Sequence, residues 1–413
     1  MPIRRLATLA LVLLPTLAGL VQADDPPVVS EKARKIHESG MLFDGHNDLP
    51  WRLRTENDMG LDKIDLSKRL SSGHTDIPRL REGGVKAQFW SVYIPSDHEF
   101  PAKTVVEQID LVNRMVERYP DDFAMAYSAD DVERIVKAGK IASLIGMEGG
   151  IAIEDDLAQL RAFAKLGARY MTLTHNKNLT WADAATDDPK HDGLTPFGER
   201  VVKEMNRLGM LVDISHIAPS TMADVLRVSQ APVIASHSSA RTISDHPRNV
   251  PDQILKELPR NGGVIMVNFY PGFIVPEAGQ QWQERRALRD KYPNKPEYDA
   301  ALADYNAKHP KPRHGTIKDV ADHIDQIVKV AGIDHVGIGS DFDGINTVPD
   351  GLEDVSTYPR LTQELVNRGY SETDIHKILG GNVLRAFRQV GEVAARLQKT
   401  TRPEIDTIKP EKN

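Results

Sequence analysis

The sequence predicts an α/β protein in the form of a closed (β/α)8 barrel of the TIM type. Eight short apolar runs alternate with segments whose apolar residues recur at helical spacing. Nearly continuous apolar strands between amphipathic helices indicate a parallel sheet that is buried on both faces. Eight such units favour a closed barrel over an open sheet. No internal repeat is visible in the chain.

The predicted elements follow one another with few interruptions. A short helix at residues 31–38 leads into the first strand, and a closing helical segment at 371–398 ends the pattern. Proline or serine near helix starts, and glycine after several helix ends, agree with the usual boundary signals. The predicted strands are residues 42–48, 85–94, 141–147, 168–173, 210–215, 233–236, 263–268 and 335–340, and the helices between them are residues 105–118, 129–137, 157–166, 196–208, 219–228, 252–258 and 317–330.

One segment interrupts this alternation. Residues 272–313, between the seventh strand and its helix, are polar and charged. Because loops of this length rarely lack secondary structure, we expect a helical excursion at the mouth of the barrel. This insertion is either a lid or an interface, or a solvated segment without a role of its own.

Composition excludes several classes of site. The chain has 413 residues and no cysteine, so disulfides, zinc–thiolate sites and cysteine nucleophiles are ruled out. A formal charge of −7, without a basic stripe, argues against nucleic acid as a partner. Any metal ion must therefore be bound by His, Asp and Glu.

The N-terminus has the features of a secretory signal peptide. Arg4 and Arg5 precede an apolar run at residues 6–20, and small residues follow before Asp24. This run is too short for a stable membrane span, and the C-terminus has no hydrophobic tail for a lipid anchor. We expect a signal peptide at residues 1–23 and a single barrel domain at residues 24–413. The mature protein would be exported, periplasmic or secreted, without a stable membrane anchor.

Candidate metal ligands lie where the predicted strands end. His46 and Asp48 end the first strand, and side chains two residues apart point the same way along a strand. In a (β/α)8 barrel, the C-terminal ends of the strands meet at the rim that carries the chemistry. Six of the eight predicted strands end in His, Asp or Glu at this rim. In addition to His46 and Asp48, these residues are Glu148, His175, Asp213, His216, His237, Asp341 and Asp343.

These residues predict a metal centre, since imidazole and carboxylate groups suit zinc or a similar divalent ion. A tetrahedral catalytic zinc needs only three protein ligands. The rim supplies more, so we expect two ions, with Glu148, which is followed by two glycines, as the bridge. Two ions about 3.5–4 Å apart activate a hydroxide for attack on a carbonyl or phosphoryl centre. The residues alone therefore indicate a binuclear metal hydrolase.

Seven short motifs occur in order along nearly the whole chain. They are residues 44–48 (DGHND), 146–150 (GMEGG), 173–176 (LTHN), 214–216 (ISH), 236–240 (SHSSA), 248–252 (RNVPD) and 339–344 (GSDFDG). Together they resemble the membrane (renal) dipeptidase family of zinc peptidases, in the form of a bacterial secreted member. The resemblance implies a catalytic barrel of the metallo-dependent hydrolase type that cleaves dipeptides.

The resemblance also implies a set of metal ligands. His46 and Asp48 would bind one zinc ion, His216 and His237 would bind the other, and Glu148 would bridge the two. A hydroxide that bridges the two zinc ions would then attack the peptide bond of the dipeptide.

Further residues would contact the substrate. The resemblance implies that His175 contacts the substrate carbonyl and stabilises the oxyanion, and that Arg248 binds the free carboxylate. Asp341 would contact the substrate and pass the proton from the attacking water to the leaving amine. Tyr270 either lines the substrate pocket or packs as an ordinary aromatic residue. Asp343 is expected to be a supporting or turn residue.

Two other functions remain open from the sequence. A binuclear barrel hydrolase that acts on esters, lactones or phosphotriesters would share the metal centre but would need no carboxylate clamp such as Arg248. A secreted binding protein on an inactive barrel would not need a complete ligand set. Animal members of the family carry cysteines and a lipid-anchor signal, which this chain lacks. A homodimer is implied by the resemblance alone.

Overall fold

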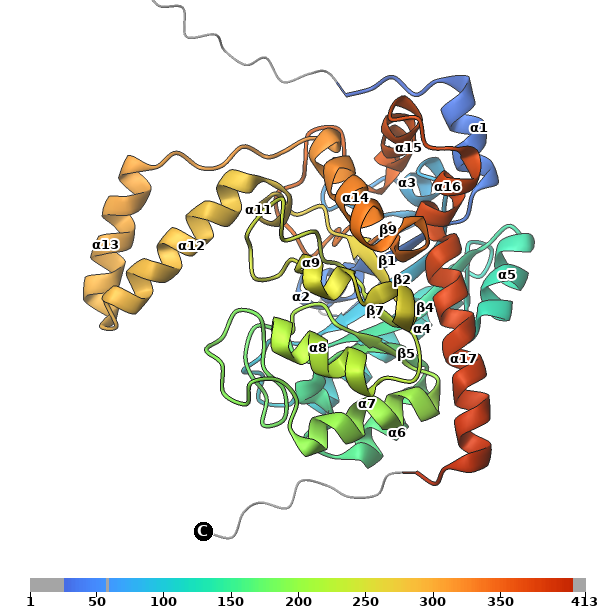
Figure 1. Ribbon diagram of the computed structural model, residues 1–413. Coiled ribbons are helices and arrows are strands. Elements are labelled where there is room, and N and C mark those ends of the chain that lie inside the picture. Colours follow the sequence, from blue (N-terminus) through green and yellow to red (C-terminus); the bar gives the residue numbers. More distant parts are fainter. Residues whose placement is uncertain (1–25, 57–58, 404–413) are drawn as a thin grey trace, which may run out of the picture.

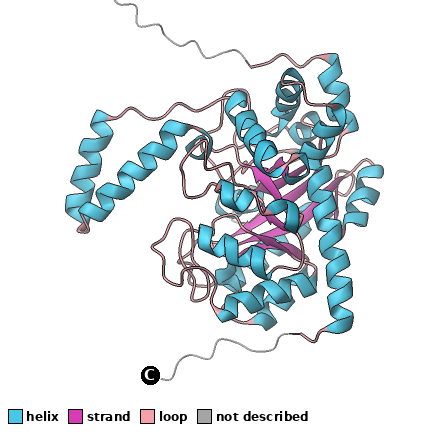
Figure 2. Cartoon of the chain, in the orientation of Figure 1, coloured by secondary structure: helices cyan, strands magenta, loops and turns pink. Residues whose placement is uncertain are grey.

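A closed barrel of eight parallel strands forms the centre of the computed structural model, which describes residues 26–56 and 59–403 (Figure 1). The ring closes because β2 pairs with both β1 and β4. Figure 2 shows the strands at the centre and the helices packed around them. The predicted fold class is thus confirmed. The barrel strands are β1 (Leu42–Asn47), β2 (Val85–Tyr93), β4 (Ile141–Glu148), β5 (Ala168–Thr172), β6 (Leu211–Asp213), β7 (Val233–Ala235), β8 (Val264–Val267) and β9 (Val336–Ile338).

One further strand, β3 (Phe123–Met125), was not predicted. It pairs in parallel with residues 141–143 at the start of β4, while β5 pairs with β4 farther along. Three residues are too few to display the alternation by which a strand is recognised in a sequence. β3 therefore extends the sheet without joining the closed ring.

Helices cover the outside of the barrel and connect successive strands. The predicted helix at residues 252–258 is confirmed only for residues 252–255, because the segment is divided between two short helices, α9 (Asp252–Leu255) and α10 (Leu258–Asn261). A proline at position 259 would clash with the carbonyl of residue 255 in a continuous helix. The helices before the insertion are α1 (Glu31–Ser39), α2 (Leu49–Glu56), α3 (Ile77–Glu82), α4 (Pro101–Arg118), α5 (Ala129–Lys137), η1 (Gly150–Ile153), α6 (Leu157–Leu166), α7 (Pro196–Leu208), α8 (Pro219–Val228), α9 (Asp252–Leu255) and α10 (Leu258–Asn261).

Residues 272–313 contain the helices expected of the insertion. Two of them lie side by side as a hairpin that projects from the barrel (Figure 1). The insertion consists of α11 (Pro271–Ile274), α12 (Pro276–Lys291) and α13 (Lys295–Lys308), and the chain then continues through α14 (Ile317–Ala331), η2 (Ile333–His335), η3 (Val355–Thr357), α15 (Tyr358–Asn367), α16 (Glu372–His376), η4 (Lys377–Gly381) and α17 (Asn382–Thr400).

Apolar side chains fill the barrel at the end where the strands begin. Phe43 of β1 and Phe89 of β2 stack with their ring centroids 5.3 Å apart. Phe387 of α17 meets Phe89 edge-on, and α17 also contacts β8 and β9. Since α17 closes this end, the opposite rim is the part of the barrel that is free to carry a site.

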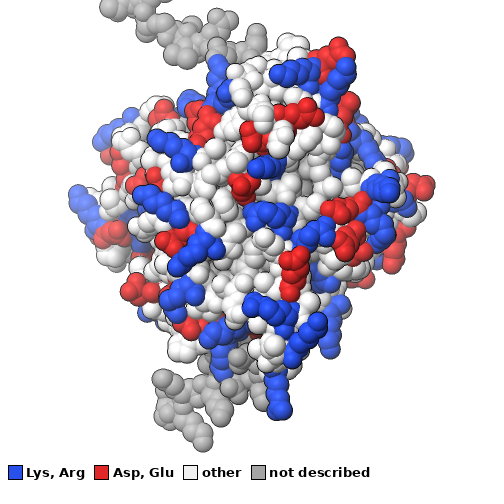
Figure 3. Space-filling model, turned by 45° about the vertical axis from the view of Figure 1, so that its right-hand side comes forward, with Lys and Arg blue, Asp and Glu red and all other residues white. Residues whose placement is uncertain are grey.

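The outer surface is mixed in charge on the face seen in Figure 3, where cationic and anionic side chains are interspersed. Within residues 26–56 and 59–403, no helix is both long and apolar enough to span a bilayer. The predicted signal peptide at residues 1–23 lies outside the described part of the chain, so export of the protein stays a prediction.

Candidate active site

Side chains from four strand ends meet at one rim of the barrel. His46 lies in β1 and Asp48 follows it, while Glu148 is the last residue of β4. His216 and His237 come shortly after β6 and β7. None of the five is more than 7% exposed. The structure therefore brings all the predicted metal ligands together in one buried cluster.

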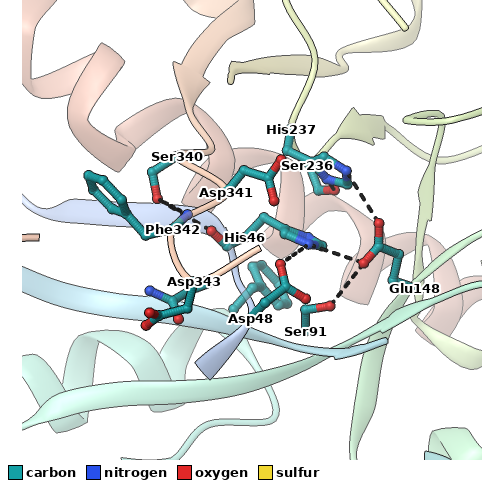
Figure 4. A network of polar contacts seen from close by, with 12 residues as sticks. His46, Asp48, Ser91, Glu148, Ser236, His237, Ser340, Asp341, Phe342 and Asp343 are labelled. Atoms are coloured by element: carbon teal, nitrogen blue, oxygen red, sulfur yellow. Dashed lines mark hydrogen bonds and ion pairs between the residues drawn. The ribbon is translucent and has the colours of Figure 1, made fainter. Parts of the chain in front are cut away.

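Glu148 lies between two groups of ligand atoms, as Figure 4 shows for His46, Asp48 and His237. Its Oε2 atom is 3.3 Å from His46 Nε2, which is itself 3.1 Å from Asp48 Oδ2. Its Oε1 atom is 3.0 Å from His216 Nε2 and 3.4 Å from His237 Nε2. The two oxygens of one carboxylate thus face different imidazoles, which is the arrangement expected of a ligand shared by two cations.

The hydrogen bonds around His237 place a lone pair inside this cluster. Ser236 Oγ donates to Asp213 Oδ2 at 2.6 Å, so it accepts from His237 Nδ1, which is 2.7 Å away. Burial lowers the pKa of His237 well below its ordinary value, so the ring is neutral. Its Nε2 atom then carries a lone pair, which lies 3.0 Å from His216 Nε2 and faces the Glu148 carboxylate. A lone pair in this position, beside an ionised carboxylate, is available to a divalent cation.

The protonation of the neighbouring groups also fits a metal ion. Burial lowers the pKa of His216 well below its ordinary value. Burial raises the pKa of Glu148, but His46 and the contacts with His216 and His237 outweigh it and hold this pKa well below its ordinary value. Burial lowers the pKa of His46, but the Tyr170 hydroxyl and the neighbouring carboxylates outweigh it and hold this pKa well above its ordinary value. A bound cation would take the place of the proton that His46 Nε2 then shares with these carboxylates. Imidazoles and carboxylates in this arrangement are zinc ligands, so the residues present fit a pair of divalent ions.

Tyr170 of β5 is a site residue that the sequence did not single out. Its hydroxyl contacts His46 Nδ1 at 2.8 Å and so fixes the orientation of the ring. Gly146 leaves space for it, because a Cβ atom there would lie 2.0 Å from Tyr170 Cζ. The available signal was a hydroxyl-bearing aromatic residue within a short strand, which is also typical of ordinary core packing.

Three residues at the rim have backbones in the left-handed region. His216 has φ +66°, Asp341 has φ +68° and Asp343 has φ +63°, values that non-glycine residues rarely adopt. Strain of this kind is concentrated at functional sites, where the surrounding structure maintains it. Gly344 contributes by having no side chain, because a Cβ atom there would lie 2.2 Å from Asp48 Oδ2 and 2.5 Å from Asp341 Oδ1.

Asp341 lies on the His46 and Asp48 side of the cluster. One ligand atom from each of these three residues lies within 4.8 Å of the other two. Asn268 Nδ2 donates to Asp341 Oδ2 at 2.9 Å. Burial, together with the charges of Asp48 and Glu148, raises the pKa of Asp341 to about 7. A carboxyl group with this pKa can both accept and return a proton near neutral pH.

Arg248 is buried in the wall of the same cavity, which has a volume of about 950 Å³ and is also lined by His175 and Tyr270. It is 2% exposed, and its guanidinium lies over the Phe273 ring at 5.0 Å. Nη1 donates to Ser238 Oγ at 3.3 Å, and Nε has no partner in the described residues. Burial lowers the pKa of Arg248 to about 10, so it remains charged at neutral pH. A buried cation with so few partners suits an anionic ligand.

His175 lies beside the cluster, with its ring 4.4 Å from that of His216. Ser96 Oγ accepts from the Asn176 backbone N–H at 3.2 Å, so its own proton is available to His175 Nδ1 at 3.3 Å. Burial lowers the pKa of His175 and keeps the ring neutral. The remaining hydrogen is then on Nε2, where it can be donated to a ligand.

The other predicted residues take different positions. Tyr270 is the N-cap residue of α11, and its ring meets Phe273 edge-on at 5.0 Å. Asp343 is turned away from the cluster, since its carboxylate accepts from the His74 backbone N–H at 2.8 Å. Aromatic residues that sequence reasoning missed also line the cavity, because nothing in their spacing distinguishes them from core residues, and they are Trp51, Tyr93, Phe273 and Trp282.

Comparison with known proteins agrees with this geometry. Residues 30–401 match the family described as membrane dipeptidase (Peptidase family M19). The structure of the probable dipeptidase PvdM from Pseudomonas aeruginosa is similar over 88% of this chain and 98% of its own, with 29% sequence identity and a TM-score of 0.76. A metallopeptidase from Rhodobacter sphaeroides, liganded with a phosphinate mimic of the dipeptide L-Ala-D-Ala, covers 85% of this chain and 99% of its own, with 26% identity and a TM-score of 0.71.

A second solved metallopeptidase supports the same assignment. Dipeptidase AC, described as a metallopeptidase of family M19, covers 85% of this chain and 98% of its own, with 26% identity and a TM-score of 0.70. The family match extends over nearly all of the described residues, including the five predicted metal ligands and Arg248. The chain belongs to the membrane dipeptidase family of metallopeptidases.

Proposed function

We propose that this protein is a dipeptidase that works with two divalent metal ions, zinc being the expected element. The observation that carries the proposal is the position of Glu148, whose two carboxylate oxygens face different imidazoles in a cavity that also contains the buried Arg248 cation. His46 and Asp48 would hold one ion, His216 and His237 would hold the other, and Glu148 would contact both. Such ions, when bound, lower the pKa of water and polarise a carbonyl group.

The remaining residues orient the substrate and move protons. Arg248 binds the free carboxylate of the dipeptide, which replaces the partners that its guanidinium lacks within the protein. His175 donates from Nε2 to the carbonyl oxygen as negative charge develops there. Asp341, whose pKa burial raises to about 7, accepts a proton from the attacking water and passes it to the leaving amine.

A screen of substrate classes tests this function against the alternative of an esterase, lactonase or phosphotriesterase. The purified protein, loaded with zinc, is expected to hydrolyse L,L or L,D dipeptides with a higher kcat/KM than simple esters, lactones or phosphotriesters. A chelator should remove the activity, and added zinc should restore it. Faster turnover of a substrate that has no free carboxylate, or activity that survives complete metal removal, would overturn the proposal.

The Ser236→Ala variant tests how the metal ligands are held. It removes the contacts of Ser236 Oγ with His237 Nδ1 and with Asp213. We expect metal affinity to fall about 10- to 100-fold, the usual effect of losing such a supporting hydrogen bond, as measured by competition with a chromophoric chelator. Ser143→Ala is the matched control, since Ser143 is equally buried and its hydroxyl has no partner in the described residues. Equal affinities of the two variants would contradict this role.

A further inference from the structure

The insertion encloses a second cavity next to the candidate active site. This cavity has a volume of about 330 Å³ and lies between α12 and residues 311–314, which follow α13. His246, Tyr270 and Trp282 line both this cavity and the active-site cavity. The two cavities therefore share one wall, and residues of the insertion form much of the lining of the second cavity.

The two cavities differ in charge. The active-site cavity contains several carboxylates, whereas none of the described residues that line the second cavity is acidic. Three cationic residues line it, namely Arg285, Lys311 and Arg313. Arg313 is neutralised by Asp319, with contacts of 2.5 and 2.6 Å to its two carboxylate oxygens. The positive charge that remains in the second cavity comes from Arg285 and Lys311.

Among residues 26–56 and 59–403, these two cations have no anionic partner. Arg285 donates to the neutral Gln281 Oε1 at 3.2 Å and lies 5.8 Å from the centre of the Tyr305 ring. Its buried Nε atom has no partner in the described residues. Within that same part of the chain, neither Arg285 nor Lys311 forms an ion pair. A pocket with two such cations and no acid is suited to a carboxylate.

The shared wall lies next to the residue expected to bind the substrate carboxylate. The Arg248 guanidinium and the His246 ring both pack on Phe273, at 5.0 and 4.7 Å. The His246 ring in turn lies 5.1 Å from that of Trp282. When a dipeptide is bound through its α-carboxylate at Arg248, the side chain of its C-terminal residue is therefore close to this wall.

We propose that the second cavity is a subsite for an acidic side chain, aspartate or glutamate, on the C-terminal residue of the substrate. The inference rests on the proposed dipeptidase function and names a preferred substrate class for it. Arg285 and Lys311 provide the charge that attracts the side-chain carboxylate, and His246, Tyr270 and Trp282 form the passage between the two cavities. The insertion thereby determines specificity while leaving the metal ligands unchanged.

A pair of substrates that differ only in charge tests the subsite. We expect Ala-Glu to be hydrolysed with a kcat/KM at least about tenfold above that of Ala-Gln, the range of one hydrogen bond to a charged group. Both substrates are assayed in L,L and L,D forms. Lys311→Gln and Arg285→Gln should each bring the ratio of kcat/KM for Ala-Glu to that for Ala-Gln towards one, without changing kcat/KM for Ala-Ala. Lys308→Gln is the control, since Lys308 is exposed, pairs with Asp304 on α13 and does not line the cavity.

The possible results separate the two proposals. If Ala-Ala is hydrolysed and the Ala-Glu to Ala-Gln ratio is near one, or the ratio is high but unchanged in both variants, the subsite is wrong and the dipeptidase function stands. If no dipeptide is hydrolysed by the zinc-loaded protein, the dipeptidase function itself fails. Lys311→Gln keeps the test valid if Arg285→Gln perturbs the packing of α12 on α13, because Lys311 is exposed.

Discussion

Replacing Glu148 with glutamine is expected to lower kcat/KM for dipeptides by about a thousandfold or more, which corresponds to the several kcal/mol of stabilisation that bound ions supply. A neutral amide has one acceptor oxygen, while Glu148 presents one oxygen to His46 and the other to His216 and His237. The variant would therefore hold at most one ion well. The measurement is steady-state kinetics together with metal content per chain.

Glu154→Gln is the control for this variant, because Glu154 lies shortly after Glu148 in the chain but outside the metal cluster. It should keep wild-type activity and metal content. Circular dichroism would show whether Glu148→Gln folds normally. A folded Glu148→Gln protein with undiminished activity and full metal content would contradict the bridging role.

Replacing Arg248 with glutamine is expected to lower kcat/KM for Ala-Ala on the order of 100- to 1,000-fold, because it removes a buried partner of the substrate carboxylate. The amide Ala-Ala-NH₂ lacks this carboxylate and should be affected little. The ratio of kcat/KM for Ala-Ala to kcat/KM for Ala-Ala-NH₂, which should be large in the wild type, should approach one in the variant. Removing a buried and poorly paired cation should not destabilise the fold, so the thermal midpoint should be unchanged or higher.

Arg241→Gln is the matched control, because Arg241 belongs to the same loop, pairs with Asp245 and does not line the cavity. It should leave both substrates unaffected. An Arg248→Gln enzyme that still hydrolyses Ala-Ala as well as the wild type would favour the esterase, lactonase or phosphotriesterase alternative, which requires no carboxylate clamp.

The meeting of the candidate metal ligands at one rim could be predicted because of where strands end in this fold. His46, Glu148 and His237 each lie at or just after an apolar run, and a barrel brings such positions to one rim. The barrel itself followed from the number and spacing of those runs. Strand lengths were less accurate, since β6, β7 and β9 end earlier than predicted. The backbone leaves the extended conformation there, as the positive φ angles of His216 and Asp341 show.

The supporting contacts could not be predicted in the same way. Tyr170 reaches His46 across the barrel, and Ser236 links Asp213 to His237 through the register of β6 and β7. Such contacts depend on which residues face each other across strands, and no local pattern in the sequence records this. The second cavity could not be predicted for the same reason, because it forms only where α12 and residues 311–314 come together in the folded chain.

Anomalous X-ray diffraction from crystals of the purified protein, measured at the absorption edge of the bound metal, would show directly whether two ions share Glu148. Two peaks are expected, one among His46, Asp48 and Glu148 Oε2, and the other among His216, His237 and Glu148 Oε1. A single peak in the fully active protein, or peaks that do not contact Glu148, would contradict it.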